Sequence, residues 1–449
     1  MKKLLIILTL LLAVQTAKAQ TANELLPVLR ERVEVGKTNQ SIAAAVIDEQ
    51  GTRFVSFGKT APTADAKNSD ENTVFEIGSL TKVFTATLLA EAVRRGEVKL
   101  DDPLSKFLPA NVKVPTRGGV EITLLDLATH TSALPRLPSN FAPKNIQNPY
   151  ADYTVAQMYE FLSSYDLPRD SGTKYEYSNF GMTLLGHILS LRAKTSYEDL
   201  VKTRILKPLK MDDTTITLSP AQTARTAQGF DENGEAAALW DFGGLGSAGA
   251  LRSTAKDLAK FVAANLGLTK TDLSAAFAEA RKPRREAGTK LKIGLGWHIL
   301  AAATGAIVWH NGGTGGFRSF AGFDAERKKG IVLLTNSAES VDDIGFHFLD
   351  AAMPLRKIAP AVAVAEKVLD EYVGEYELAP NVVFTVTRRA ERLFAQLSGQ
   401  PNLRVFAEAE NKFYYKTVKA QLIFNRGANN KIESLTLNQN GNQTARKIK

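Results

Sequence analysis

The chain has 449 residues, a formal net charge of +9 at neutral pH, and hydrophobic and charged fractions of 44% and 23%, which are typical of a globular protein. It contains no cysteine, so disulfide frameworks, thiolate metal sites and thiol nucleophiles are excluded. The basic residues are not interleaved with aromatic ones as in a nucleic-acid site, so we expect a solvated basic surface and no nucleic-acid partner.

Residues 1–19 have the pattern of a signal peptide. Lys2 and Lys3 precede an apolar run from Leu4 to Val14, and Ala17-Lys-Ala19 has small side chains where signal peptidase needs them. The run is shorter than the roughly 20 residues that span a bilayer. The sequence therefore predicts export, with the periplasm as destination, and a mature chain that starts at Gln20 with a charge of +6 and has no integral membrane segment.

Strand patterns occur at both ends of a first large domain, which we expect to cover residues 20–357. They lie at 41–47, 52–57, 307–309, 317–323 and 330–335. Helical spacing of apolar residues over 79–95 predicts a buried helix, a second helix is expected over 341–353, and the region 104–285 is mainly helical and rich in loops. These elements predict an α+β fold, in which an antiparallel sheet built from the two chain ends is flanked by helices and encloses a helical insertion.

The composition changes after residue 357. An Ala/Pro/Val-rich stretch over 358–365 predicts a linker. Short strand patterns then recur at near-regular spacing with turns between them, so residues 366–449 are expected to form a small all-β barrel.

The segment Phe75-Glu-Ile-Gly-Ser-Leu-Thr-Lys82 places Ser79 at the start of the apolar helix and Lys82 three residues later, on the same helical face. An ammonium in a partly desolvated cleft can lose its charge and serve as the base for a serine hydroxyl. Ser-x-x-Lys alone is weak support, because serine caps helices and lysine decorates their surfaces. Two further segments change that interpretation.

The first of these segments is Tyr175-Glu-Tyr-Ser-Asn179. It offers the phenol of Tyr177 for proton transfer and the amide of Asn179 for contacts with a lysine and a substrate carbonyl. The second is Trp309-His-Asn-Gly-Gly-Thr-Gly-Gly-Phe317, a strand edge rich in glycine, which commonly marks close approach of a ligand to the backbone. The alternative for this glycine run is a bulge that turns the chain.

In this order, the three segments strongly resemble the penicillin-recognising serine hydrolases: class C β-lactamases, D-alanyl-D-alanine peptidases and related esterases. The resemblance covers about residues 38–350 and includes Leu100-Asp-Asp-Pro103, Ile122 to Pro135 and Gly294-Leu-Gly-Trp297. The segment from Asp102 to Arg136 is especially similar to the AmpH-type carboxypeptidase/endopeptidases. The C-terminal domain resembles the lipocalin-like barrels appended to many such hydrolases.

The resemblance implies a role for each matched residue. Ser79 would be the acylated nucleophile, Lys82 and Tyr177 the proton-transfer pair, and Asn179 a substrate-amide contact. The backbone N–H groups of Ser79 and Gly313 would form the oxyanion hole. The substrate-binding strand, Lys-Thr-Gly in much of the family, is here His310, Asn311 and Gly312. Lysine would be a permanent cation for a substrate carboxylate, whereas His310 is expected to be charged only in part near neutral pH.

Other chemistries have little support in the sequence. The other histidines (His130, His187, His298 and His347) lie outside any motif and are expected to be structural. No pair has the spacing of a zinc enzyme, so we expect neither a metal nor a cofactor. No serine has glycine two positions before it, which argues against a Ser-His-Asp hydrolase. No role is assigned to the tryptophans.

The sequence thus predicts an exported serine hydrolase that acts through an acyl-enzyme on Ser79. The expected partners are small-molecule or peptide substrates, with D-alanyl-D-alanine peptides of peptidoglycan and β-lactams ahead of simple esters. Because His310 stands where much of the family has lysine, the β-lactamase alternative is weakened. An esterase of the same family, or a penicillin-binding sensor that does not hydrolyse its adduct, stay open as alternatives.

Overall fold

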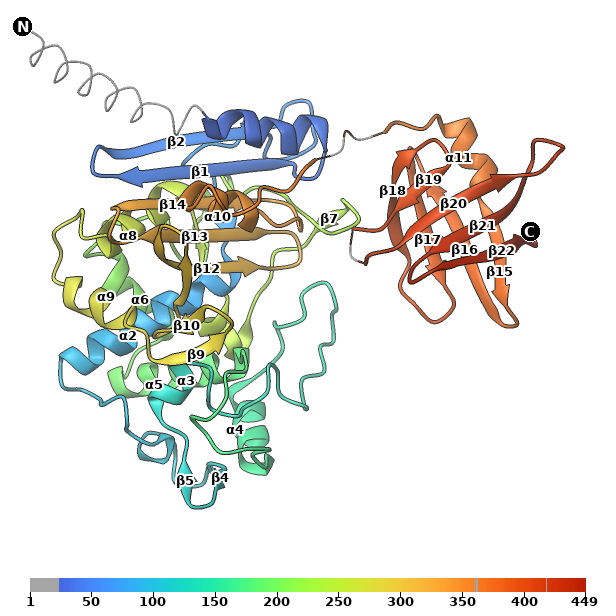
Figure 1. The fold of residues 1–449 in the computed structure, drawn as a ribbon. Coiled ribbons are helices and arrows are strands. Elements are labelled where there is room, and N and C mark those ends of the chain that lie inside the picture. The colour runs from blue at the N-terminus through green and yellow to red at the C-terminus, as the bar shows by residue number, and fades with distance from the viewer. Residues whose placement is uncertain (1–23, 359, 361, 417) are drawn as a thin grey trace, which may run out of the picture. The chain divides into compact units, whose positions relative to one another are not determined.

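The computed structural model describes residues 24–358, 360, 362–416 and 418–449, so the predicted signal peptide lies outside the described residues. The described chain divides into two compact units (Figure 1). The first comprises residues 24–33, 39–231 and 236–356, and the second comprises 34–38, 232–235 and the described part of 357–449.

The first unit contains an eight-stranded antiparallel sheet, in which strands from the two ends of the unit lie side by side (Figure 1). In spatial order the strands are β2 (Gly51–Gly58), β1 (Ser41–Asp48), β14 (Lys329–Thr335), β13 (Arg318–Asp324), β12 (Gly305–Gly313), β11 (His298–Ala302), β10 (Leu291–Ile293) and β9 (Arg285–Gly288). Strand β1 pairs with β14 in the register Ile42 to Thr335. The predicted fold class, an α+β sheet assembled from both ends, is confirmed.

The central strands are buried on both faces, which explains their nearly continuous apolar sequence. Successive side chains of β1 alternate between two hydrophobic clusters, so that Ala43 and Ala45 face one cluster while Ile42 and Ala44 face the other. Helices α2 and α8 contribute to the first cluster, and α10 with the helix over 24–30 covers the second.

Most helices of the first unit lie, in sequence, between the strands at its two ends. They are α2 (Thr81–Arg94), α3 (Leu124–Ala128), α4 (Val155–Ser164), α5 (Asn179–Ala193), α6 (Tyr197–Val201), α7 (Pro220–Thr223), α8 (Ala255–Asn265), α9 (Ser274–Ala280) and α10 (Asp342–Leu349). Shorter elements are the helical turns η1 (Glu31–Val35), η2 (Gly78–Leu80), η3 (Leu104–Lys106), η4 (Lys202–Leu206) and η5 (Gly243–Ala248), and the strand pairs β3–β8 (Phe75–Glu76, Arg252–Ser253), β4–β5 (Thr116–Arg117, Val120–Glu121) and β6–β7 (Gly229–Phe230, Ala236–Ala237). Among the described residues, every helix is too short or too polar to span a bilayer.

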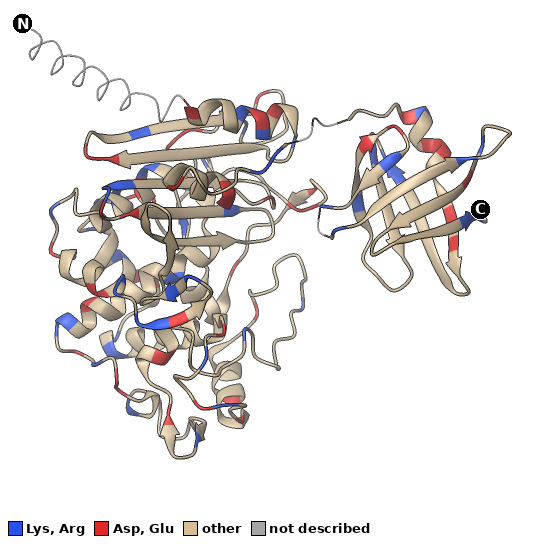
Figure 2. Ribbon diagram, in the orientation of Figure 1, with Lys and Arg blue, Asp and Glu red and all other residues tan. Residues whose placement is uncertain are grey.

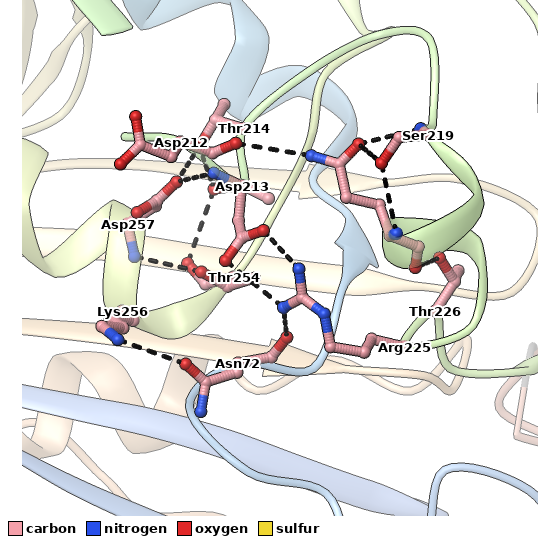
Figure 3. Close-up of polar contacts among 12 residues, drawn as sticks. Asn72, Asp212, Asp213, Thr214, Ser219, Arg225, Thr226, Thr254, Lys256 and Asp257 are labelled. Atoms are coloured by element: carbon pink, nitrogen blue, oxygen red, sulfur yellow. Dashed lines mark hydrogen bonds and ion pairs between the residues drawn. The ribbon is translucent and has the colours of Figure 1, made fainter. Parts of the chain in front are cut away.

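A polar network ties the start of α8 to the segment that leads into the serine turn (Figure 3). Asp257 accepts hydrogen bonds from the backbone N–H of Asp213 (2.8 Å) and the hydroxyl of Thr214 (3.1 Å). Arg225 forms an ion pair with Asp213 and donates to the backbone oxygen of Asn72 over 2.6 Å. Because Asn72 lies three residues before β3, which leads into η2, these contacts help to fix the approach of the chain to the predicted nucleophile.

The second unit is a closed antiparallel barrel, because its first and last strands pair through Tyr376 and Lys447. Helix α11 (Glu366–Tyr372) precedes it, and the Tyr372 ring stacks on Phe424 at 4.2 Å in the barrel core. The strands are β15 (Gly374–Ala379), β16 (Val382–Arg389), β17 (Arg392–Leu397), β18 (Leu403–Ala409), β19 (Lys412–Tyr414), β20 (Gln421–Arg426), β21 (Ile432–Asn438) and β22 (Asn442–Lys447). The predicted C-terminal barrel is therefore present. Lysine and arginine residues are spread among acidic ones over both units (Figure 2).

Candidate active site

Ser79 and Lys82 meet at the start of helix α2. Ser79 lies in the 3-10 turn η2, directly before the helix, and Lys82 Nζ is 2.9 Å from Ser79 Oγ. The same Nζ donates a hydrogen bond to the backbone oxygen of Ala248, in η5, over 2.7 Å. The two contacts hold the amine against the hydroxyl of the predicted nucleophile.

Lys82 is completely buried. Desolvation is the largest cause that holds the pKa of its amine well below the usual range, and the nearby charge of Arg136 acts in the same direction. No acidic side chain of the described residues pairs with this amine to offset these effects. A lysine in such a place readily gives up its proton, and the neutral amine has a lone pair that can accept the proton of Ser79.

Tyr177 is positioned by His130, a residue with left-handed backbone conformation (φ +56°). The backbone oxygen of His130 accepts the N–H of Glu176 (2.8 Å), and its Nδ1 accepts the N–H of Ser178 (3.1 Å). Both neighbours of Tyr177 are thus held by one residue, whose ring lies 4.5 Å from the Tyr177 ring. His130 must be unprotonated at Nδ1 to accept this bond, and burial, the largest cause, holds its pKa well below the usual range.

The environment of Tyr177 favours its protonated form. Burial, the largest cause, raises the pKa of its phenol to about 12, while a hydrogen bond with the Ser79 side chain and the charge of Arg136 oppose this shift. The ring centre lies 5.0 Å from Lys82 Nζ. Burial thus makes the phenol hold its proton more firmly and the amine give up its proton more readily, which is the separation of pKa values expected of an acid and base pair.

Glycines let strand β12 approach the serine turn. A Cβ atom at Gly312 would lie 2.9 Å from the backbone nitrogen of Ser79, and one at Gly78 (φ +50°) would lie 2.6 Å from the backbone nitrogen of Gly313. Any larger residue at either position would push the strand and the turn apart. This close approach brings the backbone amides of Ser79 and Gly313 to one junction, as the predicted oxyanion hole requires.

His310 is buried in β12, and its protonation differs from our expectation. Its Nδ1 lies 2.5 Å from the backbone oxygen of Asn311, which can only accept, so the proton is on Nδ1 and Nε2 is an acceptor. Burial, the largest cause, and the charges of His298 and Lys82 hold the pKa of His310 well below the usual range. The expectation that His310 is partly charged near neutral pH was wrong, because a buried imidazole among basic groups does not keep a second proton.

A cavity of about 520 Å³ opens over the serine turn. Six of the eight predicted site residues line it, whereas Lys82 and His310 are buried outside the lining; the six are Ser79, Tyr177, Asn179, Asn311, Gly312 and Gly313. Asn179 Oδ1 is buried and has no hydrogen-bond partner among the described residues, so an incoming amide N–H would satisfy it. The side-chain amide of Asn311 instead donates a hydrogen bond to Asp342 of α10 over 2.5 Å, so this side chain binds the helix.

The cavity also has lining residues to which the sequence gave no role. These include Arg136, Tyr150, Trp240, Phe242, His298 and Arg318. The rings of Tyr150 and Phe242 stack at 5.1 Å, and Trp240 lies 5.2 Å from Tyr150. Arg136 directly follows the stretch from Ile122 to Pro135 that carries the family resemblance, so the sequence could have indicated that Arg136 lies near the site. Tyr150 comes from the loop before α4, whereas Trp240 and Phe242 share the loop before η5, so no single local pattern connects all three.

The fold and the serine turn define a serine hydrolase of the β-lactamase and D-alanyl-D-alanine peptidase class. Residues 29–350 match the family model described as beta-lactamase, and the chain belongs to that family. Residues 359–448 match a domain of unknown function (DUF3471). The family resemblance and the serine hydrolase activity predicted from the sequence are thereby confirmed.

Individual relatives agree with this assignment. The chain is 31% identical over 335 residues to the D-alanyl-D-alanine-carboxypeptidase/endopeptidase AmpH of Escherichia coli K12, covering 70% of this chain and 84% of that protein. It is 27% identical over 390 residues to penicillin-binding protein 4* of Bacillus subtilis 168, covering 79% and 83%. A crystal structure of a beta-lactamase/D-alanine carboxypeptidase from Yersinia pestis superposes with a TM-score of 0.65 at 25% identity, covering 75% of this chain and 98% of that chain.

Proposed function

We propose that the protein is an exported peptidase that cleaves D-alanyl-D-alanine peptides of peptidoglycan, and reacts with β-lactams, through an acyl-enzyme on Ser79. The observation that carries this proposal is the 2.9 Å contact between Ser79 Oγ and the buried amine of Lys82. A hydroxyl with a desolvated amine at this distance is activated for attack on an amide carbonyl.

Acylation begins when the neutral Lys82 amine accepts the proton of Ser79 and the serine oxygen bonds to the substrate carbonyl carbon. The carbonyl oxygen takes the electron pair and is stabilised by the backbone N–H groups of Ser79 and Gly313. When the tetrahedral intermediate collapses, the bond to the leaving nitrogen breaks and Tyr177 donates its proton to that nitrogen. The proton on Lys82 then returns to Tyr177, which leaves an ester on Ser79 and both groups as they started.

Deacylation repeats these steps with water as the nucleophile. The neutral Lys82 amine takes the water proton, Tyr177 donates its proton to the departing Ser79 oxygen, and the proton on Lys82 then returns to Tyr177. Asn179 holds the substrate amide through its buried Oδ1, and Asn311 and Gly312 form the strand edge along which the substrate backbone lies. Peptides and β-lactams share the amide carbonyl that this arrangement attacks.

The preference for peptides over β-lactams is supported by the residue at position 310. The family lysine would supply a permanent cation there, whereas His310 is neutral and buried. The AmpH relative is named as a carboxypeptidase and endopeptidase, which agrees with this preference. Simple esters are the second candidate substrates, because a neutral His310 places no demand for a carboxylate on the substrate.

Export is part of the proposal and is supported by the sequence of residues 1–19, which precede the described chain. The periplasm is the compartment in which a D-alanyl-D-alanine peptidase meets its substrate. Pulse labelling of the expressed full chain, followed by cell fractionation, tests it. Processing to a mature protein that starts at Gln20 is the expected result, and an unprocessed cytoplasmic chain would contradict it.

A turnover panel tests the substrate assignment. Wild type and Ser79→Ala are assayed with nitrocefin, diacetyl-Lys-D-Ala-D-Ala and p-nitrophenyl esters. We expect release of D-alanine from the peptide by wild type alone. Turnover of esters without any turnover of peptide would contradict the peptidase assignment, and a permanent nitrocefin adduct without any turnover would identify a sensor.

A further inference from the structure

Arg136 places a cation in the wall of the cavity with no acidic residue beside it. It lies in the loop between α3 and α4, is exposed, and has its guanidinium carbon 5.2 Å from the centre of the Tyr177 ring. Among the described residues, no side chain forms an ion pair or a hydrogen bond with this guanidinium. A guanidinium that faces a cavity in this way is suited to bind an anion in bidentate fashion.

The backbone of Arg136 fixes it next to Asn179. Its carbonyl oxygen accepts the N–H groups of Asn179 (3.1 Å) and Phe180 (3.2 Å) at the start of α5. The Oδ1 of Asn179 is itself buried and has no partner among the described residues. An acceptor for an amide N–H and a cation for a carboxylate therefore occupy neighbouring positions on the same wall of the cavity.

The other residues that line the cavity do not provide a second cation beside an amide acceptor. The lining contains no aspartate or glutamate, and its other arginine, Arg318, comes from strand β13. The Nη1 of Arg318 donates to the backbone oxygens of Thr314 (2.7 Å) and Phe317 (2.9 Å), which ties it to the end of its own strand. His310, at the position of the family lysine, is neutral.

We propose that Arg136 binds a carboxylate on the acyl part of the substrate, the part that stays on Ser79, while Asn179 accepts the amide N–H beside it. The substrate class is an N-acylated compound with a free carboxylate close to that amide. A stem peptide whose residue before D-Ala-D-Ala has a side-chain carboxylate belongs to this class, as does a β-lactam with a carboxylated acylamino group. The inference rests on the proposed acylation of Ser79.

Two penicillins test this assignment, because carbenicillin is benzylpenicillin with one added carboxylate on the acyl side chain. The second-order rate constant for acylation of Ser79 is measured for both by intact mass spectrometry, in wild type, Arg136→Gln and Arg136→Lys. We expect wild type to prefer carbenicillin by about fivefold to tenfold, as a charge-assisted contact at an exposed site allows. Arg136→Gln should bring the ratio to about one, and Arg136→Lys should restore part of the preference.

The ratio of the two rates separates binding from any effect of Arg136 on Lys82 or Tyr177, because such an effect changes both rates by the same factor. An equal ratio in wild type and Arg136→Gln would overturn the inference, as would a wild type that does not prefer carbenicillin. Failure of both penicillins to label Ser79 is a different result, because it would overturn the proposed function and the inference with it.

Discussion

Lys82 Nζ lies 5.0 Å from the centre of the Tyr177 ring, and burial acts on the two groups in opposite directions. Desolvation disfavours the charged form of each, so it lowers the pKa of the ammonium and raises that of the phenol. Burial therefore favours the neutral form of both groups. A neutral base and a neutral acid on either side of one hydroxyl can move a proton from Ser79 to the leaving group without building up net charge.

Replacement of Lys82 by methionine keeps most of the length of the unbranched side chain and removes the base. We expect the acylation rate to fall by about 10²–10⁴, the usual contribution of a positioned general base. Stopped-flow acylation with a fluorescent penicillin measures it. Lys113→Met, at an exposed lysine, is the matched control and should react like wild type. Equal rates for Lys82→Met and wild type would show that another group is the base.

Tyr177→Phe removes the proton donor and retains the ring. Acylation by a peptide should slow by about 10²–10⁴, because its amine leaving group must be protonated. A p-nitrophenyl ester, whose leaving group departs without protonation, should lose much less. Tyr175→Phe is the control, since the Tyr175 hydroxyl lies 2.9 Å from His298 Nε2 and takes no part in the proposed transfer. Equal losses for peptide and ester in Tyr177→Phe would contradict the assigned role.

The acidic limb of the pH profile should report Lys82. Only the neutral amine is a base, so kcat/KM rises with pH through the pKa of Lys82 and is lost as pH falls below it. The charge of Arg136 lowers this pKa, after desolvation as the larger cause, so Arg136→Gln should shift the acidic limb to higher pH. Because Arg136 is exposed, the difference between wild type and variant should shrink at high salt. A limb that stays in place, or moves to lower pH, would contradict the assignment.

Gly312→Ala tests the close approach of β12 to the serine turn. Its Cβ would lie 2.9 Å from the Ser79 nitrogen and closer still to the backbone oxygen of Ile77, so strand and turn must separate. We expect a loss of about 1–3 kcal/mol in the free energy of unfolding, as for overpacking elsewhere, and a larger proportional loss of acylation. Gly246→Ala is the control, because its Cβ would find its nearest neighbour at 3.7 Å. A fully active Gly312→Ala would show that the oxyanion geometry does not depend on this contact.

The sequence predicted most of the sheet because local patterns define it. Residues 41–47 and 330–335 are almost continuously apolar, as is typical of strands buried on two faces, and they became β1 and β14. The strands β9, β10 and β11 were missed, since they are short, mixed in polarity and partly exposed. In the barrel, β15, β18 and β22 and the helix α11 were missed for the same reason.

The sequence also brought the candidate site together through three separated motifs. The sequence could not predict the protonation state of His310. That state depends on burial and on the nearby His298 and Lys82, which only the folded chain brings next to His310. Nor could the sequence show that His130 holds both neighbours of Tyr177, because this requires the left-handed backbone and the fold of the 176–178 segment. Tertiary contacts determine these features.

Acylation of Ser79 is the central claim, and intact mass spectrometry with peptide mapping after incubation with benzylpenicillin tests it most directly. Wild type should gain the mass of one penicillin on the peptide that contains Ser79, and Ser79→Ala should gain none. An adduct on Ser79→Ala, or an adduct mapped to any other residue of the wild-type protein, would contradict the account.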